Sequence, residues 1–302
     1  MVKNLVLENI SVGFKLPQGV FYAVDDVSLN LPGGNFTAII GESGCGKSVL
    51  GQAILNILPS GVIKKGRVLY NGEQVEKILS AFGIIPQNPS ESLNPVRKIG
   101  KQMQDVLDVH QMADSDNSHK KQCLRLFGLE EAERVLAAYP HELSGGMLQR
   151  VLCAMAVSSK PEWILADEPT KGLDEQVGAV VRKNLLTIKQ DLHLSMLIIT
   201  HDIALAQEVC DDVLVMYAGQ VLEHNMDIWQ KPLHPYTQGF LQALPQNGLQ
   251  VIPGKAPVPG ESFSGCKFAT RCPYCKTRCK EEVPAMQQVG DAEVRCFLYA
   301  EG

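Results

Sequence analysis

The sequence predicts an α/β protein with a parallel sheet at its core. Its apolar runs at 163–166, 196–199 and 213–216 are continuous and alternate with helical stretches. Continuous apolar strands separated by helices are typical of a parallel sheet that helices cover on both faces. The chain has 302 residues, of which 45% are hydrophobic and 20% charged, so it can bury a sizeable core. This composition excludes a disordered chain.

Three further regions surround this core. Residues 1–85 are strand-rich, and turn signals (Pro-Gln-Gly and Pro-Gly-Gly) separate their segments. The strands expected there are 5–11, 21–31 and 36–40. Apolar residues recur at helical spacing from about 98 to 157, which predicts an inserted helical subdomain over about 88–157. Prolines become frequent after Trp229, so we predict a first domain over 1–230 and a loop-rich extension over 231–302.

Charge and hydropathy narrow the function classes. The 28 basic and 33 acidic residues give a net charge of −5, which argues against duplex nucleic acid as the main partner. No apolar run approaches the roughly 20 residues that span a bilayer. The first residues alternate like a strand and have none of the features of a signal peptide. We therefore expect a cytoplasmic protein that does not itself cross a membrane and keeps its thiols reduced.

The strongest motif is a glycine-rich loop, G-E-S-G-C-G-K-S, over residues 41–48. It follows an apolar strand and precedes a helical run, which is the setting of a phosphate-binding P-loop. In such a loop, backbone N–H groups and the start of the helix converge on phosphate oxygens. The residues assigned to nucleotide binding are Gly41, Ser43, Gly44, Gly46, Lys47 and Ser48. Lys47 would reach the β- and γ-phosphates, and the Ser48 hydroxyl would bind Mg²⁺.

Two adjacent acids end the apolar strand that begins at Trp163. Successive strand residues point to opposite faces, so Asp167 and Glu168 can have different roles. Asp167 can bind Mg²⁺ through water, while Glu168 orients and deprotonates an attacking water.

A third segment, L-S-G-G-M-L-Q-R over 143–150, opens a helix with Ser144, Gly145 and Gly146. This is again an anion-binding arrangement. One nucleotide can use both helix starts if two chains meet head to tail, each lending its Ser-Gly-Gly to the P-loop of the other.

With these motifs in this order, residues 1 to about 225 resemble the ATP-binding-cassette (ABC) family of P-loop NTPases. The resemblance implies a parallel-sheet core with an antiparallel β subdomain and an inserted helical subdomain. Ser144–Gly146 would be the signature motif. It also implies a Q-loop glutamine at Gln87, which would contact Mg²⁺ and water, a D-loop residue at Asp174, and a switch histidine at His201 that binds the γ-phosphate. ATP and Mg²⁺ are the implied cofactors.

Adenine recognition in this family uses an aromatic ring, because stacking is strong and tolerant of geometry. The family position corresponds best to Phe14, and Tyr22 is the alternative. The implied mechanism has two ATP molecules between two cassettes, with closure on binding, hydrolysis by a water that Glu168 activates, and reopening.

The extension resembles the C-terminal region of ATPase subunits of oligopeptide, dipeptide and nickel importers, through P-L-H-P-Y-T-Q-G-F-L at 232–241 and G-C-K-F-A-T-R-C-P at 265–273. This implies a second ATPase subunit, identical or homologous, two membrane permease subunits, a substrate-binding protein acting indirectly, and a peripheral position on the cytoplasmic side of the inner membrane. Peptide is the preferred cargo, with nickel or a metal chelate as the alternative. A remote alternative is an ABC ATPase that works without a permease.

Five of the nine cysteines gather after residue 265. In the same relatives, the spacing of Cys266, Cys272, Cys279 and Cys296 resembles the ligand set of a [4Fe–4S] cluster. The charged residues from 266 to 280 are all basic, which would lower thiol pKa values and offset the charge of a thiolate-bound cluster. Structural zinc, with Cys275 in a Cys-x-x-Cys pair, and free or disulfide-forming thiols remain alternatives.

Overall fold

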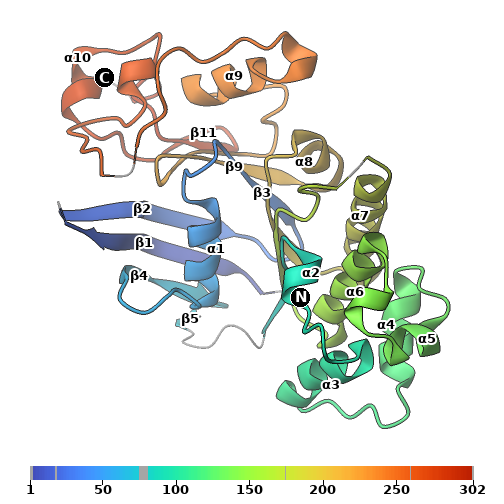
Figure 1. Cartoon of the computed structure of the whole chain (residues 1–302). Coiled ribbons are helices and arrows are strands. Elements are labelled where there is room, and N and C mark those ends of the chain that lie inside the picture. Colours follow the sequence, from blue (N-terminus) through green and yellow to red (C-terminus); the bar gives the residue numbers. More distant parts are fainter. Residues whose placement is uncertain (1–2, 18, 75–80, 174, 259, 301–302) are drawn as a thin grey trace. The chain divides into compact units, whose positions relative to one another are not determined.

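The computed structural model describes residues 3–17, 19–74, 81–173, 175–258 and 260–300 (Figure 1). Its contacts divide the chain into two compact units. The helical unit comprises Met1–Lys3, Gly33–Phe36 and Lys77–Val209. The P-loop unit comprises Asn4–Pro32, Thr37–Glu76 and Cys210–Gly302. The extension after residue 230 thus belongs to the same compact unit as the P-loop.

The P-loop unit contains an antiparallel sheet in the order β2-β1-β4-β5. Its strands are β1 (Leu5–Leu16), β2 (Gly19–Leu31), β4 (Ile63–Tyr70) and β5 (Glu73–Gln74). The antiparallel subdomain is therefore confirmed, but β1 and β2 are longer than the sequence predicts. Register shifts between Leu7 and Gly13 interrupt the alternation of β1, which hides its second half from a pattern of period two.

The same unit contains β3 (Phe36–Ile40) from Thr37 onward, and this strand is parallel to β9 (Asp212–Tyr217), with Ile40 opposite Val215. The helix α1 (Lys47–Leu55) follows β3 after the P-loop. On the other side of β9 lie three antiparallel strands in the order β10 (Gln220–Asn225), β12 (Ala292–Val294) and β11 (Gln287–Val289). The extension thus adds two strands to this part of the sheet.

A histidine bridge fixes these added strands. Nε2 of His224 lies 2.9 Å from Oδ2 of Asp212 on β9, and its Nδ1 lies 3.3 Å from Oε2 of Glu293 on β12. Burial opposes the imidazolium charge, but the hydrogen bonds to these two carboxylates outweigh it and raise the pKa of His224 to about 9. Around neutral pH the bridge is therefore an ionic one. Elsewhere in the extension, the described helices are short: α9 (Pro235–Gln242) and α10 (Thr277–Glu281).

The helical unit contains the parallel strands β6 (Phe82–Ile85), β7 (Trp163–Asp167) and β8 (Ser195–Ile199). Its helices are α2 (Pro89–Ser92), α3 (Ile99–Val109), α4 (Ser118–Leu126), α5 (Ala132–Ala137), α6 (Gly145–Ser158), α7 (Glu175–Thr187) and α8 (Ile203–Val209). The parallel strands alternate with helices as predicted, and α2 to α6 form the inserted helical region between β6 and β7.

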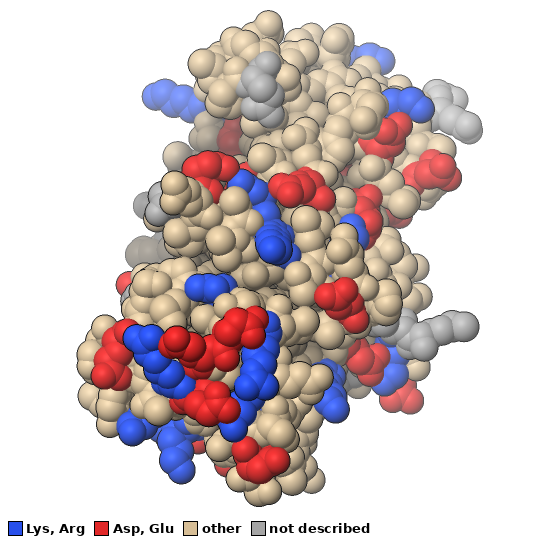
Figure 2. Space-filling view, turned by 90° about the vertical axis from the view of Figure 1, so that its right-hand side faces the viewer, with Lys and Arg blue, Asp and Glu red and all other residues tan. Residues whose placement is uncertain are grey.

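Charged side chains of both signs are mixed on the face that Figure 2 shows. On the helical unit, Glu133 pairs with both Lys121 and Arg125, and Glu131 pairs with Arg134. Opposite charges so close together largely cancel each other's field beyond a few ångströms. In the part of the chain that the structure describes, no helix is both long enough and apolar enough to pass through a bilayer.

Candidate nucleotide site and cysteine cavity

The P-loop follows β3 and ends in α1, as the motif predicts. Gly41 has φ 150°, and a Cβ there would lie 2.2 Å from the carbonyl oxygen of Met216. Gly46, with φ 106°, would place a Cβ 2.0 Å from the carbonyl oxygen of Ala23. Both glycines are therefore required by a left-handed backbone and by close packing against neighbouring main chain. At these two positions the loop backbone packs directly against neighbouring main chain.

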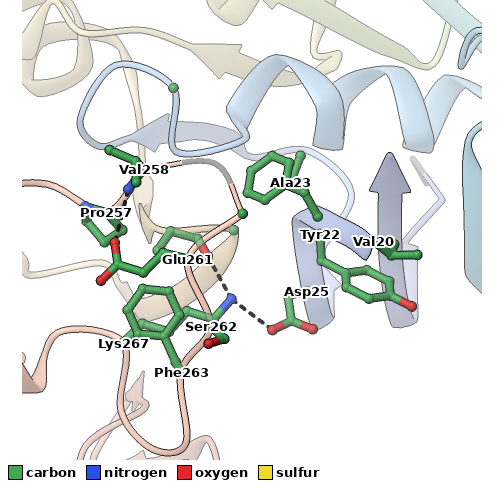
Figure 3. Close-up of a pocket in the computed structure, with 15 residues that line it drawn as sticks. Val20, Tyr22, Ala23, Asp25, Pro257, Val258, Glu261, Ser262, Phe263 and Lys267 are labelled. Carbon is green, nitrogen blue, oxygen red and sulfur yellow. Dashed lines mark hydrogen bonds and ion pairs between the residues drawn. The ribbon is translucent and has the colours of Figure 1, made fainter. Parts of the chain in front are cut away.

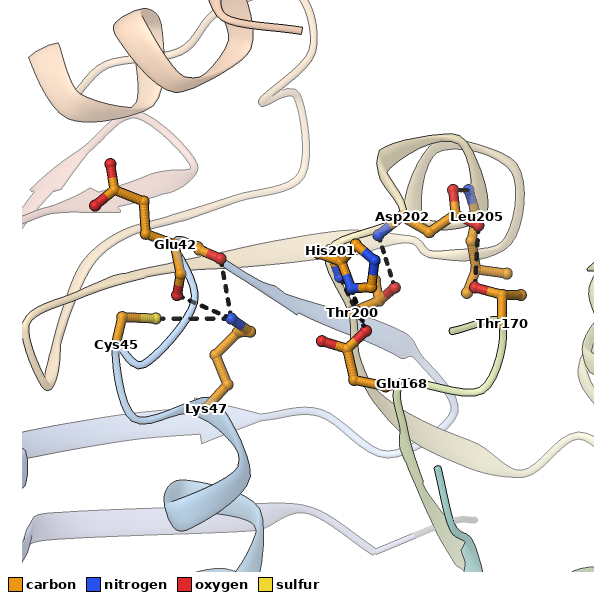
Figure 4. Close-up of polar contacts among 10 residues, drawn as sticks. Glu42, Cys45, Lys47, Glu168, Thr170, Thr200, His201, Asp202 and Leu205 are labelled. Carbon is orange, nitrogen blue, oxygen red and sulfur yellow. Dashed lines mark hydrogen bonds and ion pairs between the residues drawn. The ribbon is translucent and has the colours of Figure 1, made fainter. Parts of the chain in front are cut away.

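The Lys47 ammonium lies inside the loop (Figure 4). It donates hydrogen bonds to the carbonyl oxygens of Gly41 at 2.9 Å and Glu42 at 3.1 Å, and the Lys47 residue is only 7% exposed. Ser43, Gly44 and Ser48 are exposed along the loop. Cys45 is buried, and burial outweighs the nearby Lys47 charge and raises the pKa of its thiol. Cys45 is therefore a neutral packing residue.

A pocket of about 250 Å³ opens beside Gly44 (Figure 3). One wall is the segment Val20–Ala23 of β2, and the other consists of residues 257–258 and 260–263 of the extension. An ion pair of 2.8 Å between Lys267 and Asp25 joins the two walls. Phe21, Tyr22 and Phe263 are the aromatic residues of the lining. Phe14 on β1, which is paired with Phe21 on β2, is not among the lining residues.

In the helical unit, the carboxyl ends of β6, β7 and β8 meet at one sheet edge, because Ile85 is opposite Ala166 and Asp167 is opposite Ile199. Gln87, Glu168 and His201 follow these ends, so the structure brings the three predicted catalytic residues to the same edge. Gln87 is exposed there.

Glu168 leaves the strand with φ 49°, a left-handed conformation that is uncommon for a residue with a side chain. Its N–H donates to the carbonyl oxygen of Ile199 at 2.7 Å, which fixes this turn against β8. Its Oε2 accepts a hydrogen bond from Nδ1 of His201 at 2.5 Å (Figure 4). The Glu168 side chain is 12% exposed and that of His201 is 58% exposed. The carboxylate is thus shielded, while the histidine faces solvent.

Asp202 and Thr170, to which the sequence gives no predicted role, interact next to His201 and Glu168. Asp202 accepts a hydrogen bond from the Leu205 N–H at the start of α8, and its other oxygen accepts one from the Thr170 hydroxyl at 3.0 Å. This links the segment after β7 to the segment after β8. An Asp three residues before a helical N–H is a capping signal that could have been found in the sequence.

The predicted signature segment begins α6. Ser144 is the N-cap, and its hydroxyl accepts a hydrogen bond from the Met147 N–H at 3.3 Å. Ser144 and Gly145 are exposed, and a Cβ at Gly145 would have no neighbour within 4 Å. The chain's own packing therefore does not require glycine at this position. Asp174, the predicted D-loop residue, lies outside the described residues.

The four predicted ligand cysteines, Cys266, Cys272, Cys279 and Cys296, line one cavity of the extension, and Cys275 is not among its lining residues. The other lining residues are largely apolar, including Phe268, Pro284 and Phe297. All nine cysteines lie in the described ranges and are free thiols. Among the described residues, no three His, Cys, Asp or Glu side chains are grouped so that they could hold one metal ion.

The expectation that neighbouring basic residues lower the thiol pKa values is wrong for three of these cysteines. Burial raises the pKa of Cys266 and of Cys272 to about 11, and it also raises that of Cys296. Lys276 lowers the pKa of Cys296, but by less than burial raises it. Desolvation has a larger effect on these thiol pKa values than the basic residues do. Most basic side chains of this segment point to solvent or to other partners, such as Lys267 to Asp25 and Arg278 to Glu282.

Comparison with known proteins gives the family. Residues 24–171 match the family model described as "ABC transporter", and residues 223–279 match "Oligopeptide/dipeptide transporter, C-terminal region". An oligopeptide transport ATP-binding protein of Bacillus subtilis is 35% identical and aligns with 98% of this chain and 97% of its own length. The chain belongs to the oligopeptide/dipeptide branch of the ABC transporter ATPases.

Other relatives agree with this assignment. A dipeptide transport ATP-binding protein of Escherichia coli is 35% identical to this ABC ATPase over 95% of the chain and 94% of its own length. Among solved structures, the dimeric cassette MJ0796 in a post-hydrolysis state with ADP and Pi has a TM-score of 0.63 and 25% identity, and it covers 74% of this chain. The predicted ABC fold and ATPase class of this chain are therefore confirmed.

Proposed function

We propose that this ABC ATPase hydrolyses ATP to power the import of oligopeptides or dipeptides through a membrane permease. The observation that carries the proposal is the match of both the cassette and the cysteine-containing extension to peptide-transport ATPase subunits over nearly the whole chain. In this proposal the chain lies on the cytoplasmic side of the inner membrane, held there by two permease subunits. The substrate-binding protein acts on the permease and has no contact with this chain.

The proposed chemistry assigns one role to each predicted site residue. Lys47 leaves its loop carbonyls to contact the β- and γ-phosphates. When bound, Mg²⁺ would neutralise phosphate charge, and the residues that the family resemblance assigns to it are Ser48, Asp167 and Gln87. Glu168 accepts a proton as water attacks the γ-phosphorus, the bond to the β-phosphate oxygen breaks, and ADP leaves. For this, His201 must exchange its hydrogen bond with Glu168 for one with the γ-phosphate.

In this proposal a second ATPase subunit completes the nucleotide site. The exposed Ser144 and the open space at Gly145 suit the approach of a nucleotide bound to another cassette. Gly146, one residue further, would place a Cβ in ordinary contact with Val177 at 3.8 Å. The partner is an identical or a homologous subunit, and Asp174 would cross to it.

We also propose a resident [4Fe–4S] cluster on Cys266, Cys272, Cys279 and Cys296. The support is that these four thiols line one largely apolar cavity and that Cys275 does not. Structural zinc needs four ligands about 2.0–2.3 Å from one ion, and no group of that kind occurs in the described residues. A cubane cluster instead takes each thiolate on a different iron. When bound, it would cross-link three segments of the extension.

The adenine ring is proposed to bind in the pocket beside Gly44, against Tyr22. Replacing Tyr22 by alanine is expected to weaken ATP binding about tenfold, because base stacking on an aromatic ring contributes roughly 1–3 kcal/mol. Phe14→Ala is the matched comparison, since Phe14 lies in the same hairpin, on β1 and paired with Phe21. Titration of the purified chain with ATP measures both. If only Phe14→Ala weakens ATP binding, Phe14 and not Tyr22 stacks on the adenine ring.

Transport itself tests the function. In cells that carry the complete importer, Lys47→Ala is expected to abolish uptake of labelled di- and oligopeptides, because the variant cannot bind the phosphates. Lys255→Ala, an exposed lysine of the extension, is the control and should leave uptake unchanged. Uptake of ⁶³Ni is measured in the same strains. Normal peptide uptake with loss of nickel uptake in Lys47→Ala would overturn the peptide assignment.

A further inference from the structure

The extension holds the second residue of the P-loop. All three polar groups of Glu42 have partners within the P-loop unit. Its N–H donates to the Tyr236 hydroxyl at 3.1 Å, and its carbonyl oxygen accepts from Lys47. Both carboxylate oxygens accept from Nη1 of Arg271 at 3.1 Å. Two of these three partners come from a segment about 190 to 230 residues further along the chain.

Arg271 is fixed in this position by its surroundings. Its side chain is only 6% exposed. Its Nε donates to the carbonyl oxygen of Pro253 at 3.1 Å, and its Nη1 also donates to the Tyr217 hydroxyl at 3.3 Å. The guanidinium lies 5.7 Å from the centre of the Tyr217 ring and 5.9 Å from that of Phe268. A buried guanidinium with this many partners has a single orientation, unlike a surface cation.

Tyr236 is fixed equally well. Its residue is 0% exposed, and its ring centre lies 4.6 Å from that of Tyr217 and 5.4 Å from that of Phe268. Burial raises the pKa of its hydroxyl, which therefore stays neutral. The aromatic cluster of Tyr217, Tyr236 and Phe268 thus presents one hydroxyl and one guanidinium to Glu42.

We propose that Arg271 and Tyr236 are positioning residues for ATP binding and act through Glu42. By holding Glu42 they order the loop whose following N–H groups receive the phosphates. Ordering a backbone residue costs conformational entropy, so a loop anchored in advance binds phosphate more tightly. Arg271 also neutralises the Glu42 carboxylate, which would otherwise repel the triphosphate. The inference rests on the assignment of residues 41–48 as the phosphate loop.

Both positioning residues adjoin the cysteine cavity. Arg271 directly precedes Cys272, which lines the cavity. His234 also lines it, and its Nδ1 accepts the Tyr236 N–H at 3.0 Å at the start of α9. Phe268, a member of the aromatic cluster, also lines the cavity. The cavity and the P-loop are therefore supported by the same short segments.

The test is ATP affinity of the full-length chain, measured by nucleotide titration, with kcat measured in the assembled importer. Arg271→Met is expected to raise the Kd for ATP about tenfold, and Tyr236→Phe about threefold, with kcat at saturating ATP changed less than about twofold. Adding Glu42→Gln to Arg271→Met should recover part of the affinity, because it removes the unpaired carboxylate. Arg295→Met is the matched control. Arg295 is also buried and directly precedes a cavity cysteine, but it donates to the carbonyl oxygens of Asp26 and Pro284.

The ATP affinities of these variants decide whether Arg271 and Tyr236 position the P-loop. The proposal stands if Arg271→Met and Tyr236→Phe lose affinity and Arg295→Met does not. It is overturned if both keep wild-type affinity, or if Arg295→Met loses as much as Arg271→Met, which would indicate a general effect on the extension. Tyr236→Phe keeps the ring and its packing, so it remains informative if Arg271→Met does not fold. Lys47→Ala tests the P-loop assignment separately. If this variant binds ATP with wild-type affinity, residues 41–48 are not the phosphate loop. If it loses affinity while Arg271→Met and Tyr236→Phe do not, only the role of the extension is overturned.

Discussion

Replacing Glu168 by glutamine is expected to leave ATP binding intact and to lower turnover about a thousandfold, within the range that a general base contributes. The amide keeps the shape of the side chain and can still form a hydrogen bond with His201, but it cannot accept the proton of the attacking water. The Glu168 side chain is 12% exposed, and the hydrogen bond from its N–H to the carbonyl oxygen of Ile199 fixes its turn. Phosphate release and ATP titration on the same preparation measure the two effects separately.

Glu162→Gln provides the control for this result. Glu162 directly precedes β7, as Glu168 directly follows it, and pairs with Lys3 at the surface. Its substitution should leave both binding and turnover near wild type. Hydrolysis by Glu168→Gln at the wild-type rate would refute the role of Glu168 as general base.

The second large effect concerns the cysteine cavity. Protein purified without oxygen is expected to be brown and to contain about four iron atoms per chain, as a [4Fe–4S] cluster requires. Replacing any one of Cys266, Cys272, Cys279 and Cys296 by serine should remove most of the iron. Cys275→Ser should retain it, because Cys275 is not among the residues that line the cavity. Iron and zinc analysis of all five variants makes the comparison.

Other outcomes are equally informative. A colourless, zinc-loaded wild-type protein would contradict the cluster and restore the zinc alternative. A protein with neither metal would leave the cysteines as structural thiols. If the cluster forms, ATP titration of the serine variants shows whether losing the cluster changes the affinity for ATP. A weaker affinity in Cys272→Ser than in Cys275→Ser is expected, because Arg271 directly precedes Cys272.

Much of the site could be predicted because its residues are close together in the sequence. The loop 41–48 contains its own glycines, lysine and serine, and the pair Asp167 and Glu168 ends a strand that its apolar pattern identifies. The adjacent acids were expected to follow strand alternation, but Glu168 has a left-handed φ of 49°. Its N–H bonds to the carbonyl oxygen of Ile199 on β8, a contact that sequence spacing does not encode.

The pKa values of the cysteine thiols could not be predicted by counting charged residues in the sequence. The segment from Cys266 to Lys280 has only basic charges, yet burial controls the pKa of Cys266 and Cys272. A pKa depends on the solvation of the group as much as on nearby charge, and solvation is a property of the folded state.

The sequence by itself determined the family, the ATPase chemistry and the four-cysteine pattern, since each depends on residue types at short, fixed spacings. Only the tertiary structure decided that the extension belongs to the same compact unit as the P-loop and holds Glu42 through Arg271 and Tyr236. The physical reason is distance along the chain. Contacts between residues some 200 positions apart depend on how strands pair and aromatic rings pack, and no local pattern records them.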